Sequence, residues 1–283
     1  MARVGEELSA SITRLAQAGV DSPALDAQLL MAHALNCSRL DVIAHPEHEL
    51  SDIELQGFAH MLDSRADRYP LAYILGYREF YGLDLIVSPG VLIPRPDTET
   101  LVEAAIQRLS RLSHPPTIAD IGAGSGAIAI AIAVAVPNAQ VYTTEISPQA
   151  AKVARANIEK HAMGDRVKLI EGDMLEPLLG MEFDAIVSNP PYIPTADIDT
   201  LEPEVRLYEP REALDGGTDG LDAYRVLLPG ALPLLRADGF AAMEVGAGQA
   251  RAVAEMAGDV GYLRCEIEPD LAGIERVVVA WKC

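Results

Sequence analysis

A short segment of unusual composition, Asn189-Pro190-Pro191-Tyr192, carries side chains and backbone groups that could do chemistry. It directly follows the apolar run 183–187, which predicts a buried strand. Two consecutive prolines cannot continue a strand, because each lacks a backbone donor and has a fixed φ. The chain must therefore leave the sheet at Asn189, at the carboxyl end of a strand, where ligands bind in open α/β sheets.

This segment offers an amide side chain, proline carbonyls without strand partners and an aromatic ring. Together these groups could hold a planar group that carries an NH2, by accepting its hydrogens and stacking on its face. An ordinary exit from a strand into a loop would explain the same residues. The rest of the chain has to decide between the two interpretations.

A glycine-rich turn follows a second predicted strand, 117–121, and precedes an apolar helix, 127–136. Glycines at such a turn let the backbone approach a ligand closely at the amino end of a helix. The pattern occurs in dinucleotide sites and in other nucleoside sites, so it does not choose between them by itself. The turn consists of Gly122, Ala123, Gly124, Ser125 and Gly126.

Of three acidic residues near predicted strand ends, two favour one class of cofactor. Glu145 can accept both ribose hydroxyls of any nucleoside, or it can be an ordinary surface acid before a helix. Asp120 would repel a pyrophosphate beside the glycine turn but would suit an ammonium and a sulfonium. Asp173, followed by Met174, could accept the exocyclic amine of adenine. The set fits S-adenosylmethionine better than NAD.

Strands alternate with helices from residue 117 onwards, so the predicted fold class is α/β with a Rossmann-like, doubly wound parallel sheet. Two closely spaced strands at the end of the chain, 265–268 and 276–281, predict an antiparallel hairpin at the sheet edge. The other strands are predicted at 117–121, 140–145, 167–171, 183–188 and 240–245.

The first part of the chain has a different pattern. Residues 1–70 show helical spacing without strand signals, including a capping box from Ser51 to Glu54, which predicts a smaller N-terminal helical bundle for substrate recognition. In residues 71–96, apolar and polar residues alternate around glycines, which predicts a β-hairpin linker. The cofactor-binding catalytic domain then comprises residues 97–283.

The linker ends in the stiff segment 94–99. A helix is expected to begin there, capped by Asp97 or Thr98, and to continue to about residue 112. Arg95 stands between two prolines as an exposed cation in a rigid loop. The sequence is equally consistent with a functional role for this arginine and with a solvated charge beside the domain junction.

The chain has 283 residues and a net charge of −20, from 22 basic and 42 acidic residues. This charge repels a phosphate backbone, and no run of basic residues opposes it, so we expect no direct binding of nucleic acid. The histidines and cysteines lack metal-ligand spacing, so we expect no metal. The longest apolar run, 127–136, is too short to cross a bilayer, and no signal peptide is evident. We therefore expect a cytoplasmic monomer that does not bind membranes.

The segments 120–126 and 189–192 together resemble class I methyltransferases that act on a planar nitrogen. The helical front end and the segments 94–99, 208–210 and 213–217 narrow this resemblance. With them, nearly the whole chain is similar to the protein-(glutamine-N5) methyltransferases of peptide chain release factors.

This resemblance implies methyl transfer from S-adenosylmethionine to the glutamine side chain in the Gly-Gly-Gln motif of a release factor, the protein partner. It implies that Gly122 to Gly126, Glu145, Met174 and Asn189 contact the cofactor. The segment Asn189 to Tyr192 would also hold the substrate glutamine. Relatives often have an aromatic residue at the position of Met174, but methionine can still pack on a ring face.

The chemistry assigns catalytic roles to Asn189, Pro190 and Tyr192. A carboxamide nitrogen is a poor nucleophile, because its lone pair is delocalised into the carbonyl. The Asn189 oxygen and the Pro190 carbonyl could accept its two N–H groups and stabilise the positive charge that develops on nitrogen. Tyr192 would stack on the amide plane, and the proton can leave after the transfer, so no strong base is needed.

Two other functions stay open at this point. N6-adenine methyltransferases of DNA or RNA share the Asn-Pro-Pro-Tyr segment, but the net charge of −20 and the lack of a basic recognition segment argue against them. A binding protein that keeps the fold without catalysis is disfavoured by the intact segment from Asn189 to Tyr192.

Overall fold

The computed structural model describes residues 2–282, which separate into two compact units. One unit extends to Tyr77 and includes the later segment Glu202–Tyr208. The other contains Arg78–Leu201 and the chain from Glu209 onwards. No helix in the described part of the chain is long and apolar enough to cross a membrane.

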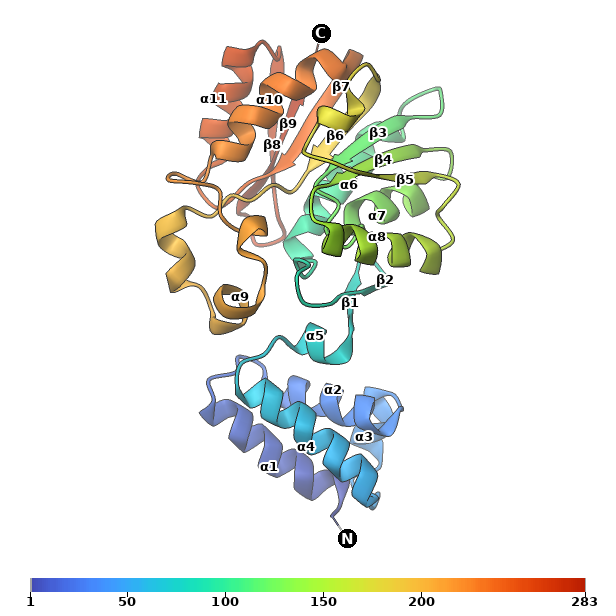
Figure 1. Cartoon of the computed structure of the whole chain (residues 1–283), viewed down its shortest axis with the longest axis vertical. Helices are drawn as coiled ribbons and strands as arrows, with labels where there is room; N and C mark the ends of the chain where they lie inside the picture. Colours follow the sequence, from blue (N-terminus) through green and yellow to red (C-terminus); the bar gives the residue numbers. More distant parts are fainter. Residues whose placement is uncertain (1, 283) are drawn as a thin grey trace. The chain divides into compact units, whose positions relative to one another are not determined.

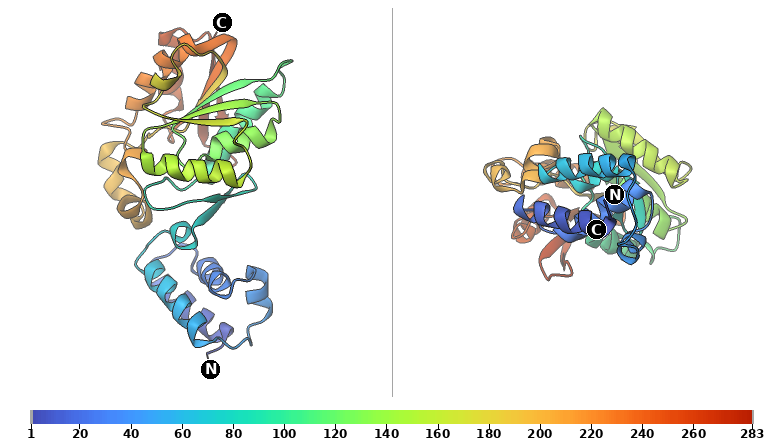
Figure 2. Two further views of the ribbon diagram at one scale, coloured as in Figure 1. Left: turned by 45° about the vertical axis from the view of Figure 1, so that its right-hand side comes forward. Right: turned by 90° about the horizontal axis from the view of Figure 1, so that it is seen from below.

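The first unit is helical, as the sequence predicts (Figure 2). Its core contains Leu15, Leu30, Met31 and Phe58, all almost completely buried. The capping box of Ser51 is present: the Ser51 hydroxyl accepts from the Glu54 backbone, and the Glu54 carboxylate accepts from the Ser51 backbone. The helices are α1 (Val4–Gln17), α2 (Pro23–Leu35), α3 (Arg39–Ala44), α4 (Asp52–Ala66), α5 (Leu71–Leu75) and α9 (Pro203–Tyr208).

Helix α9 is far from the other five in sequence but belongs to this unit through partly buried ion pairs. The Arg65 guanidinium donates to Asp26 at 2.7 Å and to Glu204 at 2.8 Å. Arg68 also pairs with Glu204, at 2.6 Å. No sequence pattern indicated this contact, because it joins side chains that are more than 130 residues apart.

The predicted β-hairpin is confirmed, as β1 (Tyr77–Phe80) and β2 (Leu83–Ile86). Its two turn residues, Tyr81 and Gly82, both have positive φ, which is the requirement of a tight hairpin turn whose twist matches the strands. The hairpin occupies less of the segment 71–96 than the alternation suggested, because the short helix α5 forms at its start.

A seven-stranded sheet organises the second unit, in the order β5-β4-β3-β6-β7-β9-β8 (Figure 1). Its first five strands are parallel, and β9 pairs antiparallel with both β7 and β8, so the predicted doubly wound sheet with a closing hairpin is confirmed. The strands are β3 (Thr117–Ile121), β4 (Gln140–Glu145), β5 (Val167–Glu171), β6 (Phe183–Ser188), β7 (Leu235–Glu244), β8 (Arg264–Pro269) and β9 (Glu275–Trp281).

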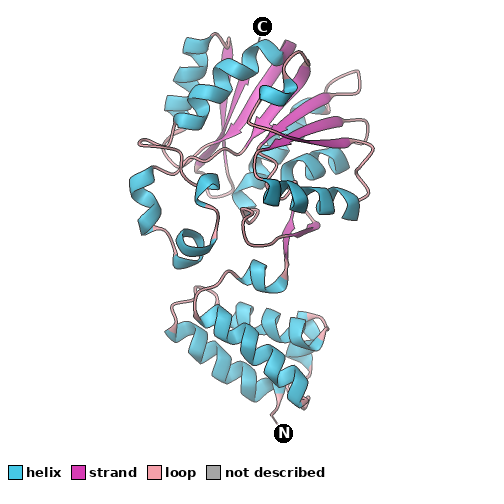
Figure 3. Cartoon of the chain, viewed as in Figure 1, coloured by secondary structure: helices cyan, strands magenta, loops and turns pink. Residues whose placement is uncertain are grey.

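Helices cover both faces of this sheet (Figures 1 and 3). Helices α6 (Glu99–Leu109), α7 (Ala127–Ala135) and α8 (Pro148–Lys160) lie on one face, and α10 (Asp222–Leu234) and α11 (Ala250–Val260) lie on the other. The chain builds outward from β3 to β5 and then crosses back to β6, so the winding direction reverses between β3 and β6. A ligand crevice is expected at such a reversal, beyond the carboxyl ends of these strands.

Two element boundaries differ from the predictions. Strand β7 begins at Leu235 and not at Phe240, because Leu235 already pairs with Phe183 across an irregular register. Helix α6 begins at Glu99 and ends at Leu109, and the Thr98 side chain makes no capping hydrogen bond. Thr98 occupies the predicted N-cap position, but its hydroxyl has a different partner, described below, and does not bond to the helix backbone.

Candidate active site

A cavity of about 550 Å³ lies beyond the carboxyl ends of β3, β4, β5 and β6. The residues that follow these strands line it, together with the loops 90–92 and 210–213. This volume lies within the usual range for small-molecule sites. The cavity therefore occupies the crevice that the strand order predicts.

The glycine turn presents open backbone to this cavity. Gly122 and Gly124 line it with φ values of +85° and +55°, and a Cβ added to either would meet no heavy atom within 4 Å. Gly126 also has a positive φ, but a Cβ there would lie 3.3 Å from the Ile130 side chain, so its role is close packing. Ala123 and Ser125 are buried in the turn and do not line the cavity.

Glu145 at the end of β4 organises the turn. Its two carboxylate oxygens accept hydrogen bonds from the backbone N–H groups of Gly124 and Ser147, both at 2.8 Å. Each oxygen keeps a further lone pair, and Glu145 lines the cavity. It can therefore hold the loop and still accept hydroxyl groups of a ligand.

Asp120 does not lie at the ligand site that the sequence predicted for it. Its side chain is fully buried and does not line the cavity. One carboxylate oxygen accepts from the Thr143 hydroxyl at 3.0 Å, and the other has no hydrogen-bond partner among residues 2–282. Burial raises the pKa of Asp120 to about 7. A direct contact with a ligand ammonium does not follow from this position.

Asp173 and Met174 follow β5 and both line the cavity. No hydrogen bond to the Asp173 carboxylate is formed within the described residues, so its oxygens are available to a ligand. Met174 has a φ of +42°, a conformation that non-glycine residues rarely adopt and that is typical of sites where the backbone is constrained by function.

The segment after β6 supplies Asn189, Pro190 and Pro191 to the cavity wall. The Asn189 side-chain NH2 donates to the Thr98 hydroxyl at 3.0 Å, which leaves the amide oxygen for another partner. Ser188, just before it, donates to the Ile121 carbonyl at 2.7 Å and so ties β6 to β3.

Tyr192 does not line the cavity as the chain stands. Its hydroxyl donates to the Glu244 carboxylate at 3.3 Å, and its backbone carbonyl accepts from the Gln249 amide at 2.9 Å. Burial, followed by the nearby negative charge of Glu244, raises the pKa of Tyr192 to about 12. The ring is therefore fixed beside the Asn189 segment as a neutral phenol.

Several of these supporting residues were not found from the sequence. Glu244 is a carboxylate at the carboxyl end of a predicted strand, which is a usable signal, whereas the pairing of Thr98 with Asn189 joins positions 91 residues apart. Arg95 does have a partner, since its guanidinium lies 2.5 Å from the buried Glu209 carboxylate. That carboxylate also accepts from the Ile93 backbone at 3.1 Å, so Arg95 holds the loop 93–95.

Comparison with known proteins identifies the family. The model of the PrmC N-terminal domain matches residues 6–76, and that of the Methyltransferase small domain matches residues 98–203. The release factor glutamine methyltransferase of Moorella thermoacetica is 48% identical over 278 residues, which cover 98% of each chain. That of Geobacter sulfurreducens is 47% identical, over 93% of this chain and 91% of the relative.

The chain belongs to the release factor glutamine methyltransferase family. Membership confirms the predicted enzyme class, a protein-glutamine methyltransferase, and its class I domain implies use of S-adenosylmethionine. A crystal structure of a methyltransferase from Pyrococcus furiosus aligns with 72% of this chain and 90% of its own, at 21% identity and a TM-score of 0.53. That likeness shows the fold alone.

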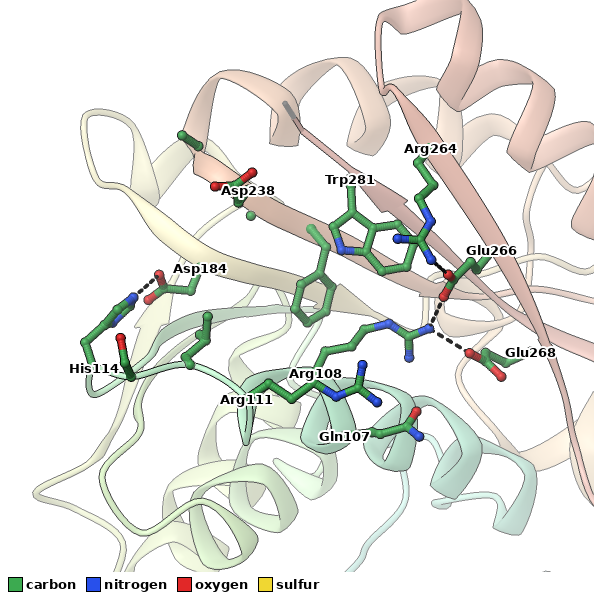
Figure 4. A pocket seen from close by; sticks show the side chains of 15 residues that line it. Gln107, Arg108, Arg111, His114, Asp184, Asp238, Arg264, Glu266, Glu268 and Trp281 are labelled. Atoms are coloured by element: carbon green, nitrogen blue, oxygen red, sulfur yellow. Dashed lines mark hydrogen bonds and ion pairs between the residues drawn. The ribbon is translucent and has the colours of Figure 1, made fainter.

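A second cavity of this family member, about 660 Å³, lies at the amino ends of the parallel strands (Figure 4). The guanidinium groups of Arg108 and Arg264 lie 5.1 and 4.8 Å from the centre of the Trp281 ring. Arg108 also bonds to Glu266 and Glu268. These polar groups satisfy one another, and no residue of the predicted site lies here.

Proposed function

We propose that this enzyme transfers a methyl group from S-adenosylmethionine to the side-chain nitrogen of a glutamine in a peptide chain release factor. One observation carries the proposal. The Asn189 amide lies at the cavity wall with its NH2 group bound to Thr98, so its oxygen is left to accept a hydrogen bond from a substrate amide. Relatives whose sequences align almost end to end are release factor glutamine methyltransferases, which agrees with this substrate.

The cavity residues fit S-adenosylmethionine. The open backbone at Gly122 and Gly124 would leave room for the methionine part of the cofactor, and Glu145 would accept its ribose hydroxyls. Asp173 would accept the adenine NH2, and Met174 would pack on the adenine ring. When bound, the cofactor supplies an electrophilic methyl group on a sulfonium.

The substrate amide would bind between this cofactor and the segment after β6. The Asn189 oxygen and the Pro190 carbonyl would accept its two N–H groups, which aims the nitrogen lone pair at the methyl group. These acceptors become more favourable as positive charge develops on the nitrogen, which is the condition for lowering the barrier. The bound cofactor would supply the methyl group from its sulfonium, and the amide nitrogen would then give up its extra proton to solvent. Because Tyr192 does not line the cavity, we propose that it supports this segment through its bond to Glu244. Its ring would stack on the substrate amide only if the side chain turned.

Protein recognition is assigned to the helical unit and to the charge of the whole chain. A release factor loop that meets ribosomal RNA should carry cations, which an enzyme with a net charge of −20 would attract. We propose that the enzyme works as a monomer in the cytoplasm, where translation ends. The domain boundaries at residues 70 and 96 and the lack of direct nucleic-acid binding stay predictions.

Labelled S-adenosylmethionine tests this function against its alternative. The enzyme is incubated with a release factor, and separately with DNA and RNA, and the label is traced in each. Label in the release factor supports the proposal. Label in adenine at a comparable rate, with none in the protein, would assign the enzyme to the adenine methyltransferases instead.

A further inference from the structure

Two loops that are far apart in the sequence complete the wall of the cofactor cavity. Residues 90–92 lie between β2 and α6, and residues 210–213 follow α9, and both loops line the cavity. Both belong to the same compact unit. Two segments that carry the family resemblance, 94–99 and 208–210, adjoin these loops in the chain, and their charged side chains have no part in the chemistry proposed above.

Each loop is fixed separately to the rest of the unit. In the first loop, Val91 forms a small buried cluster with two residues of α8, Ala150 and Val153. At the end of the second loop, the Leu214 carbonyl accepts from the Ile193 backbone at 3.0 Å, which ties the loop to the chain after β6. Neither of these contacts connects the two loops to each other.

The Glu209 carboxylate does connect them. Glu209 directly precedes the second loop, and its oxygens accept from two groups that follow the first: the Ile93 backbone N–H at 3.1 Å and the Arg95 guanidinium at 2.5 Å. The side chain of Glu209 is 1% exposed, and that of Arg95 is 33% exposed. At this burial, solvent does not compete for either bond to the carboxylate.

The pairing with Arg95 makes the burial of this carboxylate favourable. A carboxylate that is removed from water needs a cation or several donors to compensate the lost hydration. Pro96 follows Arg95 and restricts it to extended backbone, and Arg95 has a φ of −97° and a ψ of 141°. The cation is thus presented from a rigid loop, which reduces the entropy lost when the pair forms.

We infer that Glu209 and Arg95 form a clasp, which holds the loops 90–92 and 210–213 together at the cavity wall and slows the escape of the bound cofactor. Neither side chain lines the cavity, so both are positioning residues that act through the loops. The inference rests on the proposed function for the identity of the ligand. The connection between the loops depends only on the described side chains.

The binding kinetics of S-adenosylhomocysteine test the clasp. Glu209→Gln keeps the size of the side chain and removes its charge, and Arg95→Met removes the cation. We expect each to raise the dissociation rate about tenfold with little change in the association rate, as is usual when one bond at a binding site is lost. The single-turnover rate at saturating cofactor should fall much less. The double variant should be no worse than the single variants, because all three remove the same pair.

Glu266→Gln is the matched control. Glu266 pairs with Arg108 at 2.6 Å, at the opposite end of the sheet (Figure 4), so the same change there should leave the dissociation rate unaltered. Dissociation rates equal to that of the unmutated enzyme in both Glu209→Gln and Arg95→Met would overturn the inference. So would a double variant in which the two effects add, because the side chains would then act independently.

Hydrogen exchange distinguishes a clasp from a general loss of stability, and it needs neither cofactor nor substrate. In the free enzyme, Glu209→Gln should speed exchange in both segments, 88–95 and 209–216, and leave the strands of the sheet unchanged. Faster exchange throughout the sheet, or in only one of the two segments, would contradict the clasp. If both segments respond as expected but the unmutated enzyme binds no S-adenosylhomocysteine or methylates no release factor, only the proposed function fails.

Discussion

The side chain of Asn189 is the residue on which the proposed chemistry depends most. Asn189→Ala removes the acceptor that faces the substrate nitrogen, so we expect turnover to fall on the order of 10²-fold or more. Cofactor affinity should weaken less, because the glycine turn, Glu145 and Asp173 are unchanged. Single-turnover rates at saturating cofactor measure the effect. The exposed Asn138→Ala is the control, and equal rates for the two variants would remove Asn189 from the mechanism.

Asp173 offers a cleaner test of the cofactor site than the glycine turn does. A side chain at Gly124 would be strained at its φ of +55°, so a loss of binding there could reflect the fold. Asp173→Ala removes an acceptor that bonds to no described side chain, and its stability effect should be small. We expect affinity for S-adenosylhomocysteine to fall about tenfold, the effect of losing one hydrogen bond.

Calorimetry on Asp173→Ala and on the exposed control Asp165→Ala provides the comparison. An unchanged affinity in Asp173→Ala would place the adenine amine elsewhere. If the unmutated enzyme bound NAD in place of the nucleoside, the cofactor class itself would be wrong.

Residue types at strand ends could be read from the sequence, but the direction of each side chain was harder to predict. Glu145 is the last residue of its strand and lines the cavity, as its type and place suggest. Asp120 is one residue short of the end of β3, on the same side of the strand as the core residue Ile118. Side chains alternate along a strand, so Asp120 points under the helix layer and not into the crevice.

At the scale of elements, Asn157 of α8 joins the hairpin to the glycine turn. Its side-chain oxygen accepts from the Ile86 backbone at 2.7 Å, and its NH2 donates to the carbonyls of Ile86 and Ser125 at 2.9 and 2.8 Å. The side chain is fully buried, so Asn157→Ala leaves backbone groups unpaired. We expect the free energy of unfolding to fall by about 2–4 kcal/mol.

Urea denaturation with and without S-adenosylhomocysteine measures this loss, and Asn138→Ala is again the matched control. A change below about 0.5 kcal/mol, typical of surface substitutions, would contradict the structural role of Asn157.

Local patterns predicted the elements better than their contacts. The alternation of strands and helices indicated the parallel sheet, and the spacing of the last two strands indicated the antiparallel pair, because both follow from chain connectivity. The docking of α9 on the helical unit depends on Arg65 and Glu204 meeting in space, which no periodicity records. The missing capping hydrogen bond of Thr98, which does occupy the predicted N-cap position, has the same cause, since its hydroxyl bonds to Asn189 and not to its own helix.

The charge of the whole molecule affects how fast it meets its substrate. A net charge of −20 should attract the proposed cationic loop of the release factor over distances comparable with the Debye length, roughly 10 Å at 0.1 M salt. We expect kcat/KM for the intact release factor to fall steeply as salt is raised. A short neutral peptide around the target glutamine should show little salt dependence. Equal salt dependence for both substrates would show that long-range attraction does not control the rate.

Tandem mass spectrometry of the release factor after reaction identifies the methylated atom, on which the proposed function depends. We predict one added methyl group, on the side-chain nitrogen of the glutamine in the Gly-Gly-Gln motif. It should be absent when that glutamine is replaced by alanine and greatly reduced with the Asn189→Ala enzyme. A methyl group on any other residue, or one that persists when the glutamine is replaced, would contradict the proposed function.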